Sequence, residues 1–371
     1  MKKHQELAKQ AEERKTEIES KRNIPTDIMD QVKQQGLVKS WAAKEYGGKQ
    51  ASVLEVTDMV REIAYYNGSL AWVVGVTCCT SLVTGFLDPA HATALYNAPE
   101  SMIGGFAAPA GVAKKVDEGL EVSGRWSWGS GITHCTHIVG GVRIVEGEQI
   151  VGTAVVFFTP EEITTIDNWR VVGLKGSHSI DYTVKNLLIP NDRWTPFPVT
   201  TPTIDEPLYR FSFLGALSCA VASVGLGLAE RAVAEITTFV QHKKPFGQRK
   251  TLSQQAEIQT QIAKVTANFL AAKALFQTTI QEAEQETQHG NCSKETKAKI
   301  RIANAHTTKL SHEVVQEAYR LGGGYSIWET QKLEELLRDM NVVMQHGMVS
   351  ALNYRTGGSV LLGNSVPEVL L

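Results

Sequence analysis

The most constraining feature of the chain is a change of residue pattern in the middle of its sequence. Between residues 102 and 200, β-branched and aromatic residues gather in short runs that breakers such as Gly147 and Pro160 separate. The runs are 119–128, 137–145, 150–158 and 182–189. They predict the strands of a small antiparallel β-domain. Helical patterns flank this region without alternating with strands, which argues against a doubly wound nucleotide-binding sheet.

The first hundred residues predict helices. Residues 1–22 form the pattern of one charged amphipathic helix, and a shorter helix is expected from Pro25 until Gly36 ends it. Segments 54–65 and 69–87 are rich in apolar residues, so they are expected to be buried helices.

Helical periodicity returns from about residue 205. One stripe of apolar residues, spaced three or four apart, is typical of a helix packed in a bundle. Its members are Ile258, Ile262, Val265, Phe269, Ala272 and Phe276. We therefore expect three regions: an N-terminal helical domain over 1–101, a β-domain over 102–203 and a C-terminal helical bundle over 204–371.

Charge and composition limit the partners of the protein. The chain has 371 residues, with 37 Lys and Arg against 39 Asp and Glu, so no basic surface for nucleic acid or an anionic membrane is expected. Stretches 67–87 and 211–229 approach the length of a membrane span, yet Gly, Ser, Thr and Cys interrupt both, which favours buried helices. Five cysteines and a charged start with no apolar segment after it predict a cytoplasmic protein with reduced thiols.

Several motifs follow one another in a recognisable order. Residues 124–131 read Gly-Arg-Trp-Ser-Trp-Gly-Ser-Gly, and residues 173–181 read Gly-Leu-Lys-Gly-Ser-His-Ser-Ile-Asp. Phe246-Gly247, the segment from Gln316 to Gly324, and Arg338-Asp339 before His346 follow. In this order the motifs resemble the acyl-CoA dehydrogenase superfamily, and more narrowly its flavin-dependent, two-component monooxygenase branch. The resemblance implies an N-terminal helical domain, an antiparallel β-barrel-like domain and a C-terminal four-helix bundle.

The resemblance also implies a bound flavin, FAD or FMN, between the β-domain and the bundle. The residues implied to contact it are Trp128, Ser130, Gly131, Ser177, Ser179, Lys243, Phe246, Gln259, Gly322 and Gly323. Lys243 stands where the superfamily has a phosphate-binding arginine, and a lysine lacks the bidentate fork. In the family the glycine-rich loop and the basic turn serve the flavin of a neighbouring subunit, which implies a homotetramer. Without the resemblance, the simpler interpretation is that Ser130 is a turn residue and that Gly322–Gly324 end a helix.

The catalytic base of an acyl-CoA dehydrogenase is missing. The superfamily places a glutamate at one of two positions, which are Leu217 and Gly347 here. His346 stands instead where the monooxygenase branch has a histidine, and imidazole exchanges protons near neutral pH. His346, together with Ser130, is therefore the catalytic candidate, although a buried structural histidine would have the same position.

The predicted reaction is hydroxylation of a small organic substrate through a C4a-(hydro)peroxyflavin. Molecular oxygen is the co-substrate, and a separate reductase supplies reduced flavin, since no Gly-x-Gly-x-x-Gly fingerprint follows a strand. The candidate substrate-binding residues are Thr80, Phe106, His134 and His346. Thr80 and Phe106 replace the His and Ser of phenol hydroxylases, which leaves other aromatic, heterocyclic or amine substrates open.

Two alternatives remain at this point. One is an acyl-CoA dehydrogenase-like oxidoreductase with an unrecognised base, and the other is a scaffold of the same fold that has lost its chemistry. His134, His137 and His178 are either part of the site or surface histidines. No spacing of His, Cys and carboxylate residues predicts a metal site.

Overall fold

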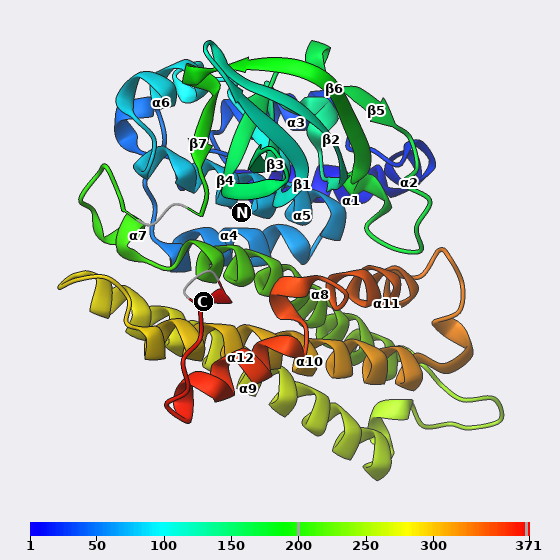
Figure 1. Cartoon of the computed structure of the whole chain (residues 1–371). Helices are drawn as coiled ribbons and strands as arrows, with labels where there is room; N and C mark the ends of the chain where they lie inside the picture. Colours follow the sequence, from blue (N-terminus) through cyan, green and yellow to red (C-terminus); the bar gives the residue numbers. More distant parts are fainter. Residues whose placement is uncertain (199–200, 368–369) are drawn as a thin grey trace.

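Helices form both ends of the chain and strands form its middle (Figure 1). The computed structural model describes residues 1–198, 201–367 and 370–371. The helices are α1 (Lys3–Glu13), α2 (Lys15–Lys21), α3 (Thr26–Gln34), α4 (Val53–Ala64), α5 (Gly68–Ser81), α6 (Pro89–Tyr96), α7 (Pro207–Arg210), α8 (Phe213–His242), α9 (Ala256–Thr287), α10 (Lys294–Gly322), α11 (Lys332–Val343) and α12 (Leu352–Leu361). The strands are β1 (Ile103–Val116), β2 (Gly119–Gly129), β3 (His137–Glu146), β4 (Gln149–Phe158), β5 (Thr164–Ile166), β6 (Ile180–Pro190) and β7 (Trp194–Pro196).

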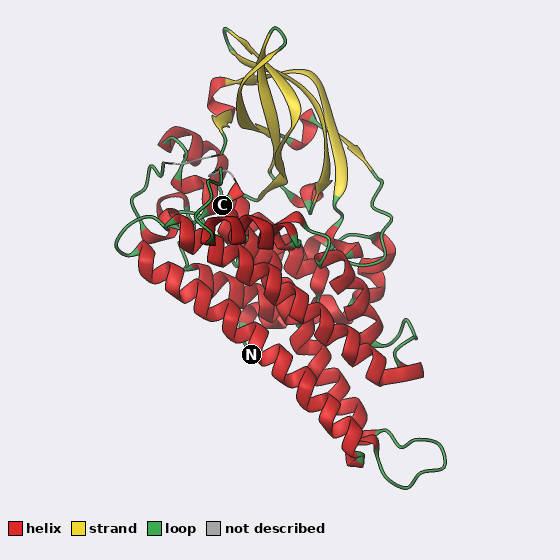
Figure 2. Cartoon of the chain, turned by 60° about the horizontal axis from the view of Figure 1, so that its bottom comes forward, coloured by secondary structure: helices red, strands yellow, loops and turns green. Residues whose placement is uncertain are grey.

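The seven strands form one sheet in the order β5-β6-β2-β1-β3-β4-β7. All neighbouring pairs are antiparallel except β1 and β3, which run parallel from Ile103 beside His137 to Lys114 beside Val145. The sheet curves over the end of the helical part of the molecule (Figure 2). No pairing joins β5 to β7 among the described residues, so hydrogen bonds do not close the sheet into a barrel.

Helices α4 and α5 lie between the sheet and the long C-terminal helices (Figure 1). Both pack on α8, and α5 also contacts β1. Local sequence explains where α4 begins: the Ser52 hydroxyl accepts from the Glu55 amide at 3.1 Å, and the Glu55 carboxylate accepts from the Ser52 amide at 2.9 Å. One continuous hydrophobic core contains residues from the sheet and from both helical regions.

The predicted fold class is confirmed, and three details differ from the sequence-based expectation. The first helix is interrupted at Arg14, so residues 3–21 form two helices. Strand β1 was not among the predicted runs, because small residues from Gly104 to Gly111 weaken its β pattern. The parallel β1–β3 pair arises because the turn after β2 reverses the chain and returns it along the free edge of β1.

The expected domain limits, 1–101, 102–203 and 204–371, remain a proposal. The described strands lie between Ile103 and Pro196, and the neighbouring helices end at Tyr96 and begin again at Pro207. Residues 199 and 200, within the second region, and residues 368 and 369, within the third, lie outside the described residues.

Two helical segments are long and apolar enough to cross a membrane by length and composition alone. They are Gly68–Gly85 and Phe213–His242, and 89% and 78% of their respective apolar windows are buried inside the fold. Packing in the core thus accounts for their apolar character, as the sequence predicts.

Trp126 in β2 offers a test of how the sheet is stabilised. Its ring is fully buried, stacks on Tyr182 with centroids 5.4 Å apart, and donates from Nε1 to the Gly141 carbonyl at 2.7 Å. We expect Trp126→Ala to lower the free energy of unfolding by about 3–5 kcal/mol, measured by chemical denaturation. Ile150→Ala, at a position 59% exposed in β4, should change it by no more than about 0.5 kcal/mol. Similar losses for the two variants would contradict this account of the sheet.

Candidate active site

A chain of buried hydroxyl groups joins the two glycine-rich motifs of the β region. Ser130 follows the end of β2, and its Oγ lies 2.7 Å from Oγ of Ser179, which lies 2.8 Å from Oγ of Ser177. The Gly131 amide donates to the Ser177 carbonyl at 2.9 Å, and Gly131 has a φ of 65°, which glycine adopts without strain. The structure therefore brings together four predicted flavin contacts: Ser130, Gly131, Ser177 and Ser179.

Trp72 connects this hydroxyl chain to His346. The indole Nε1 of Trp72, in α5, donates to Ser130 Oγ at 3.0 Å. The same indole ring makes an edge contact with the His346 ring, with centroids 5.4 Å apart and an interplanar angle of 73°. The two predicted catalytic residues thus lie on either side of one buried tryptophan, which the sequence analysis did not single out.

His346 is a neutral imidazole at neutral pH. It precedes the short turn Gly347–Val349, and its Nδ1 accepts from the Met348 amide at 3.2 Å. Burial and the nearby charge of Arg301 lower the pKa of His346 to about 4. Since Nδ1 accepts, the ring proton sits on Nε2, for which no described residue provides a partner. The sequence analysis assumed an ordinary histidine pKa, which burial beside a cation does not allow.

The Arg338-Asp339 motif supports the second glycine-rich turn. The buried Asp339 carboxylate accepts from the Leu174 amide at 2.6 Å, and Arg338 donates to the Val172 carbonyl at 2.8 Å. Leu174 and His178 have φ values of 48° and 44°, which are strained for residues with a side chain. Asp339 therefore holds the turn that carries Ser177 and Ser179 in an unfavourable backbone conformation.

Three other predicted residues have contacts of their own. Trp128 is 62% exposed, and its ring packs edge-on against Phe106 with centroids 5.8 Å apart. Thr80 lies in α5 with its hydroxyl bonded to the Val76 carbonyl at 3.2 Å. The roles of these residues toward flavin or substrate stay predictions.

The other three histidines considered for the site have separate surroundings. His134 is buried, and its Nε2 lies 2.9 Å from Asn23 Oδ1, between α2 and α3. His178 approaches Asp167 at 3.9 Å, and the buried His137 Nδ1 has no hydrogen-bond partner among the described residues. No hydrogen bond or ring contact in the described part of the chain joins His134 to His346, and its role as a substrate contact stays untested.

The other predicted flavin contacts form a separate group at the far end of the bundle. Lys243 and Phe246 lie in the exposed turn after α8, and Gln259 is exposed near the start of α9. Gly322 ends α10, and Gly323 has open space around it. The stacked rings of Phe239 and Tyr325, 4.5 Å apart, join the end of α8 to the glycine turn. No hydrogen bond or ring contact among the described residues joins this group to Ser130, and Figure 1 shows the turn after α8 on the side of the bundle away from the sheet.

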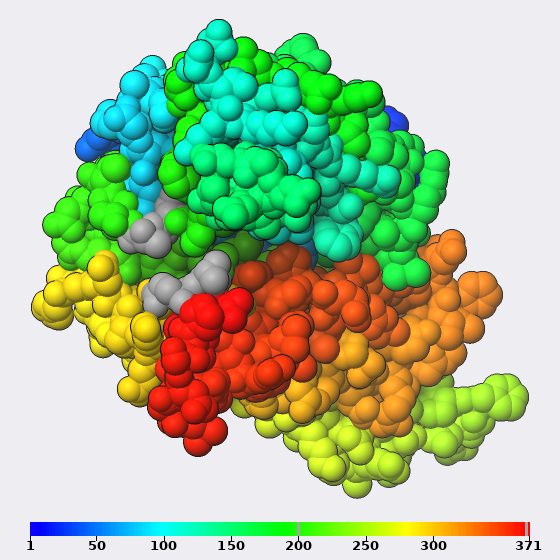
Figure 3. All heavy atoms as spheres, viewed as in Figure 1, coloured from blue at the N-terminus to red at the C-terminus, as the bar shows by residue number. Residues whose placement is uncertain are grey.

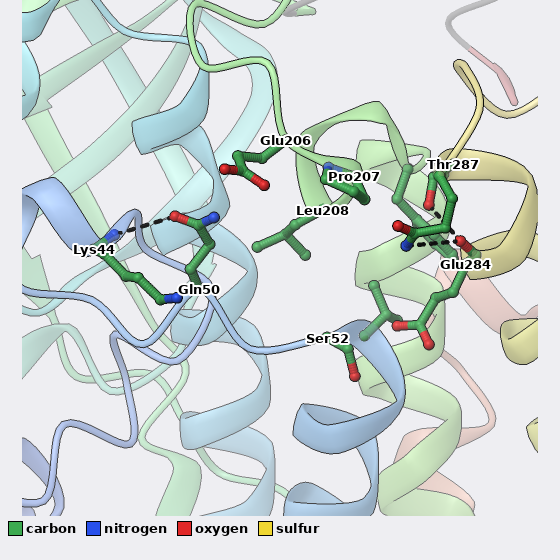
Figure 4. A pocket seen from close by; sticks show the side chains of 11 residues that line it. Lys44, Gln50, Ser52, Glu206, Pro207, Leu208, Glu284 and Thr287 are labelled. Carbon is green, nitrogen blue, oxygen red and sulfur yellow. Dashed lines mark hydrogen bonds between the residues drawn. The ribbon is translucent and has the colours of Figure 1, made fainter.

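Two cavities lie elsewhere in the molecule. One of about 300 Å³ lies between the loop before α4, α7 and the end of α9 (Figure 4). Two of its polar residues are bonded within the chain: the Lys44 amide donates to Gln50, and Glu284 accepts from the Leu54 amide at 3.1 Å. The other, of about 540 Å³, lies beside His289. Neither contains a predicted site residue.

The outer surface is hollowed where the strands meet the C-terminal segment (Figure 3).

A helical N-terminal region, a central sheet and a C-terminal bundle around a buried hydroxyl chain define a protein of the acyl-CoA dehydrogenase fold. Two family models match the chain: the N-terminal domain of acyl-CoA dehydrogenase over residues 4–89 and its C-terminal domain over residues 219–351. The chain belongs to the acyl-CoA dehydrogenase superfamily, and the resemblance predicted from sequence is confirmed.

Characterised relatives are oxygenases. The chain is 24% identical to indole-3-acetate monooxygenase from Pseudomonas putida, over 94% of this chain and 89% of that protein. It is 23% identical to p-hydroxyphenylacetate 3-hydroxylase, oxygenase component, from Acinetobacter baumannii, over 92% and 82% of the two chains. The fold of XiaF from Streptomyces sp., solved in complex with FADH2 and glycerol, matches with a TM-score of 0.90 at 20% identity, over 98% and 97%. These activities agree with the class predicted from sequence.

The buried His134 generates a prediction about pH and stability. Burial lowers its pKa to about 4, whereas an unfolded histidine titrates near 6.5. As pH falls from 6.5 toward 4, the unfolded chain takes up a proton that the folded chain does not, so the free energy of unfolding decreases by at most about 1.4 kcal/mol per pH unit. His134→Gln should make this decrease shallower in urea titrations at pH 7, 6 and 5. The exposed His289→Gln is the control, and identical slopes for wild type and His134→Gln would contradict the prediction.

Proposed function

We propose that the chain is the oxygenase component of a two-component flavin-dependent monooxygenase that hydroxylates a small organic substrate. The observation that carries this proposal is the contact of neutral His346 with Trp72, whose indole is bonded to the Ser130 hydroxyl. The named activities of the two relatives support it. A separate reductase is the expected partner, as the words "oxygenase component" in the name of one relative suggest.

The residues of the hydroxyl chain fit a flavin ring. Three serine hydroxyls that hydrogen-bond one another can also donate to or accept from a heteroatom edge, and the exposed Trp128 ring offers a flat apolar face beside them. Bound reduced flavin, FAD or FMN, would supply the electrons that activate molecular oxygen. Ser130, Ser177 and Ser179 would hold its ring.

His346 and Trp72 would control protons and water at this site. His346 presents its Nε2 proton, so it can donate a hydrogen bond to an oxygen atom of the bound reactants. Trp72 fixes the Ser130 hydroxyl and covers the His346 ring, which limits the paths by which water reaches both groups. Dry surroundings protect an oxygen-activating centre from unproductive reaction with water.

The structure offers little to the alternative of acyl-CoA dehydrogenation. Leu217 is half-buried and apolar, and Gly347 is exposed with open space where a side chain would begin. Neither position supplies the carboxylate that abstraction of an α-proton requires. The alternative of a scaffold without chemistry predicts no consumption of reduced flavin, so a simple oxidation assay separates it from the proposed function.

Replacing His346 tests the proposed chemistry. We expect His346→Ala to bind flavin nearly as well as wild type, to lower product formation on the order of 10²-fold and to release more hydrogen peroxide per reduced flavin consumed. The measurements are flavin titration, product quantification and a peroxide assay. His289→Ala, which removes an exposed histidine, is the control. Full rate and full coupling in His346→Ala would show that the histidine is structural.

We also propose a homotetramer in the cytoplasm. The group around Lys243, Phe246 and Gly323 faces solvent in one chain, and the Phe246 side chain is fully exposed. A second copy placing its flavin against this group would explain why polar, glycine and aromatic residues gather there. All five cysteines are buried free thiols, which suits a reducing compartment.

Light scattering should find a tetramer at micromolar concentration. Lys243→Gln should then weaken flavin binding by about tenfold, because one contact to the phosphate charge is removed. Lys294→Gln, an exposed lysine at the start of α10, should leave flavin binding unchanged. If the protein is a monomer in solution and still binds flavin tightly, the flavin site is not shared between subunits and the proposal is refuted.

A further inference from the structure

Arg301 is a buried arginine that has no acidic partner among the described residues. It lies in α10 with 6% of its surface exposed, and its Nη1 donates to the Met348 sulfur at 2.8 Å. No residue of the described chain accepts from its buried Nε. Two other largely buried arginines, Arg61 and Arg231, are 12% and 16% exposed at the side chain, and both pair with glutamates. A thioether is only a weak acceptor, so Met348 does not compensate the positive charge of Arg301.

The described groups around Arg301 do not supply a negative charge either. Burial raises the pKa of the Cys219 thiol to about 12, so the thiol is neutral at neutral pH. His346 is neutral as well, and the Asn304 amide is turned toward the Ser218 hydroxyl at 2.6 Å. A buried guanidinium without an anion is strongly unfavourable. A buried, uncompensated Arg301 does not stabilise the fold. Its presence is better explained by a ligand whose negative charge compensates the guanidinium.

The position of Arg301 connects it to the candidate active site. Arg301 and His346 contact the same residue, since the Met348 sulfur accepts from Arg301 and the Met348 amide donates to His346. The unpartnered Nε belongs to the edge of the guanidinium that, together with Nη2, binds a carboxylate through two parallel hydrogen bonds. No described residue accepts from Nη2. This edge is buried, so a molecule bound beside His346 can present a carboxylate to it once the side chains that cover it move aside.

We propose that Arg301 binds the carboxylate of the substrate, so that the substrates are small aryl or heteroaryl carboxylic acids rather than neutral arenes or amines. The word substrate here rests on the proposed monooxygenase function. The names of the two relatives, which act on indole-3-acetate and p-hydroxyphenylacetate, fit this class. The binding of an acid at Arg301 does not itself depend on catalysis and can be measured without it.

Pairs of acids and their neutral amides test the proposal on the wild-type protein. The probes are phenylacetate against phenylacetamide and indole-3-acetate against indole-3-acetamide, each titrated by calorimetry into the flavin-loaded chain. We expect at least one acid to bind more tightly than its amide, on the order of tenfold to a hundredfold. Equal affinity within both pairs, or no measurable binding of either acid, would overturn the proposal.

Variants of Arg301 test whether this residue causes the preference for acids over amides. Arg301→Gln should lose the preference for the acid while the affinity for the amide changes little, and Arg301→Lys should keep part of it because the charge remains without the fork. Lys299→Gln removes an exposed cation two residues earlier on the same helix and should keep the full preference. A preference that survives in Arg301→Gln would assign the acid to another site. If Arg301→Gln does not fold, the ligand pairs on wild type still decide.

Turnover assays distinguish this proposal from the proposed function. If the protein binds acids more tightly than amides but forms no hydroxylated product, the carboxylate site at Arg301 is supported and the monooxygenase function is refuted. If it hydroxylates acids and amides with equal efficiency, the monooxygenase function is supported and the carboxylate site is refuted.

Discussion

The hydrogen bond from the Trp72 indole to the Ser130 hydroxyl connects the two halves of the candidate site. Trp72 belongs to a buried helix of the N-terminal region, whereas Ser130 directly follows a strand of the sheet. The same indole ring contacts His346, which follows the last long helix of the bundle. All three regions of the chain therefore meet at one aromatic side chain, and the site exists only when all three are folded around the shared core.

A second link fixes the geometry of this meeting point. The turn that carries Ser177 and Ser179 contains two non-glycine residues in the left-handed region, and such a turn persists only where its surroundings hold it. The buried Asp339 does so through the Leu174 amide, and Ser69 of α5 accepts from the Gly176 amide at 3.1 Å. Arg338-Asp339, which sequence reasoning treats as a landmark before His346, is thus a support for the hydroxyl chain.

Local patterns made much of this architecture predictable. Apolar periodicity and breakers located most helices and four strands, because these signals act within a few residues. The parallel β1–β3 pair was missed since strand pairing depends on where a distant turn returns the chain. Ser130 and His346 were predicted from motifs, while Trp72 stood in a uniformly apolar run where one buried aromatic looks like another. Arg301 was missed because the lysines around it at the start of α10 suggest a solvated face, and only the fold shows it buried beneath Met348.

The juxtaposition of Arg301 and His346 also ties ligand charge to proton chemistry. The guanidinium charge contributes to the lowered pKa of His346, so a carboxylate bound at Arg301 would offset that charge and move the pKa back toward its ordinary range. By linkage, the same carboxylate would bind more tightly when His346 is protonated. A bound acid would therefore raise the pKa of His346 and make it a better proton acceptor. A bound neutral analogue would leave the pKa of His346 as it is in the free protein. In this arrangement one buried cation recognises the substrate and adjusts the neighbouring imidazole.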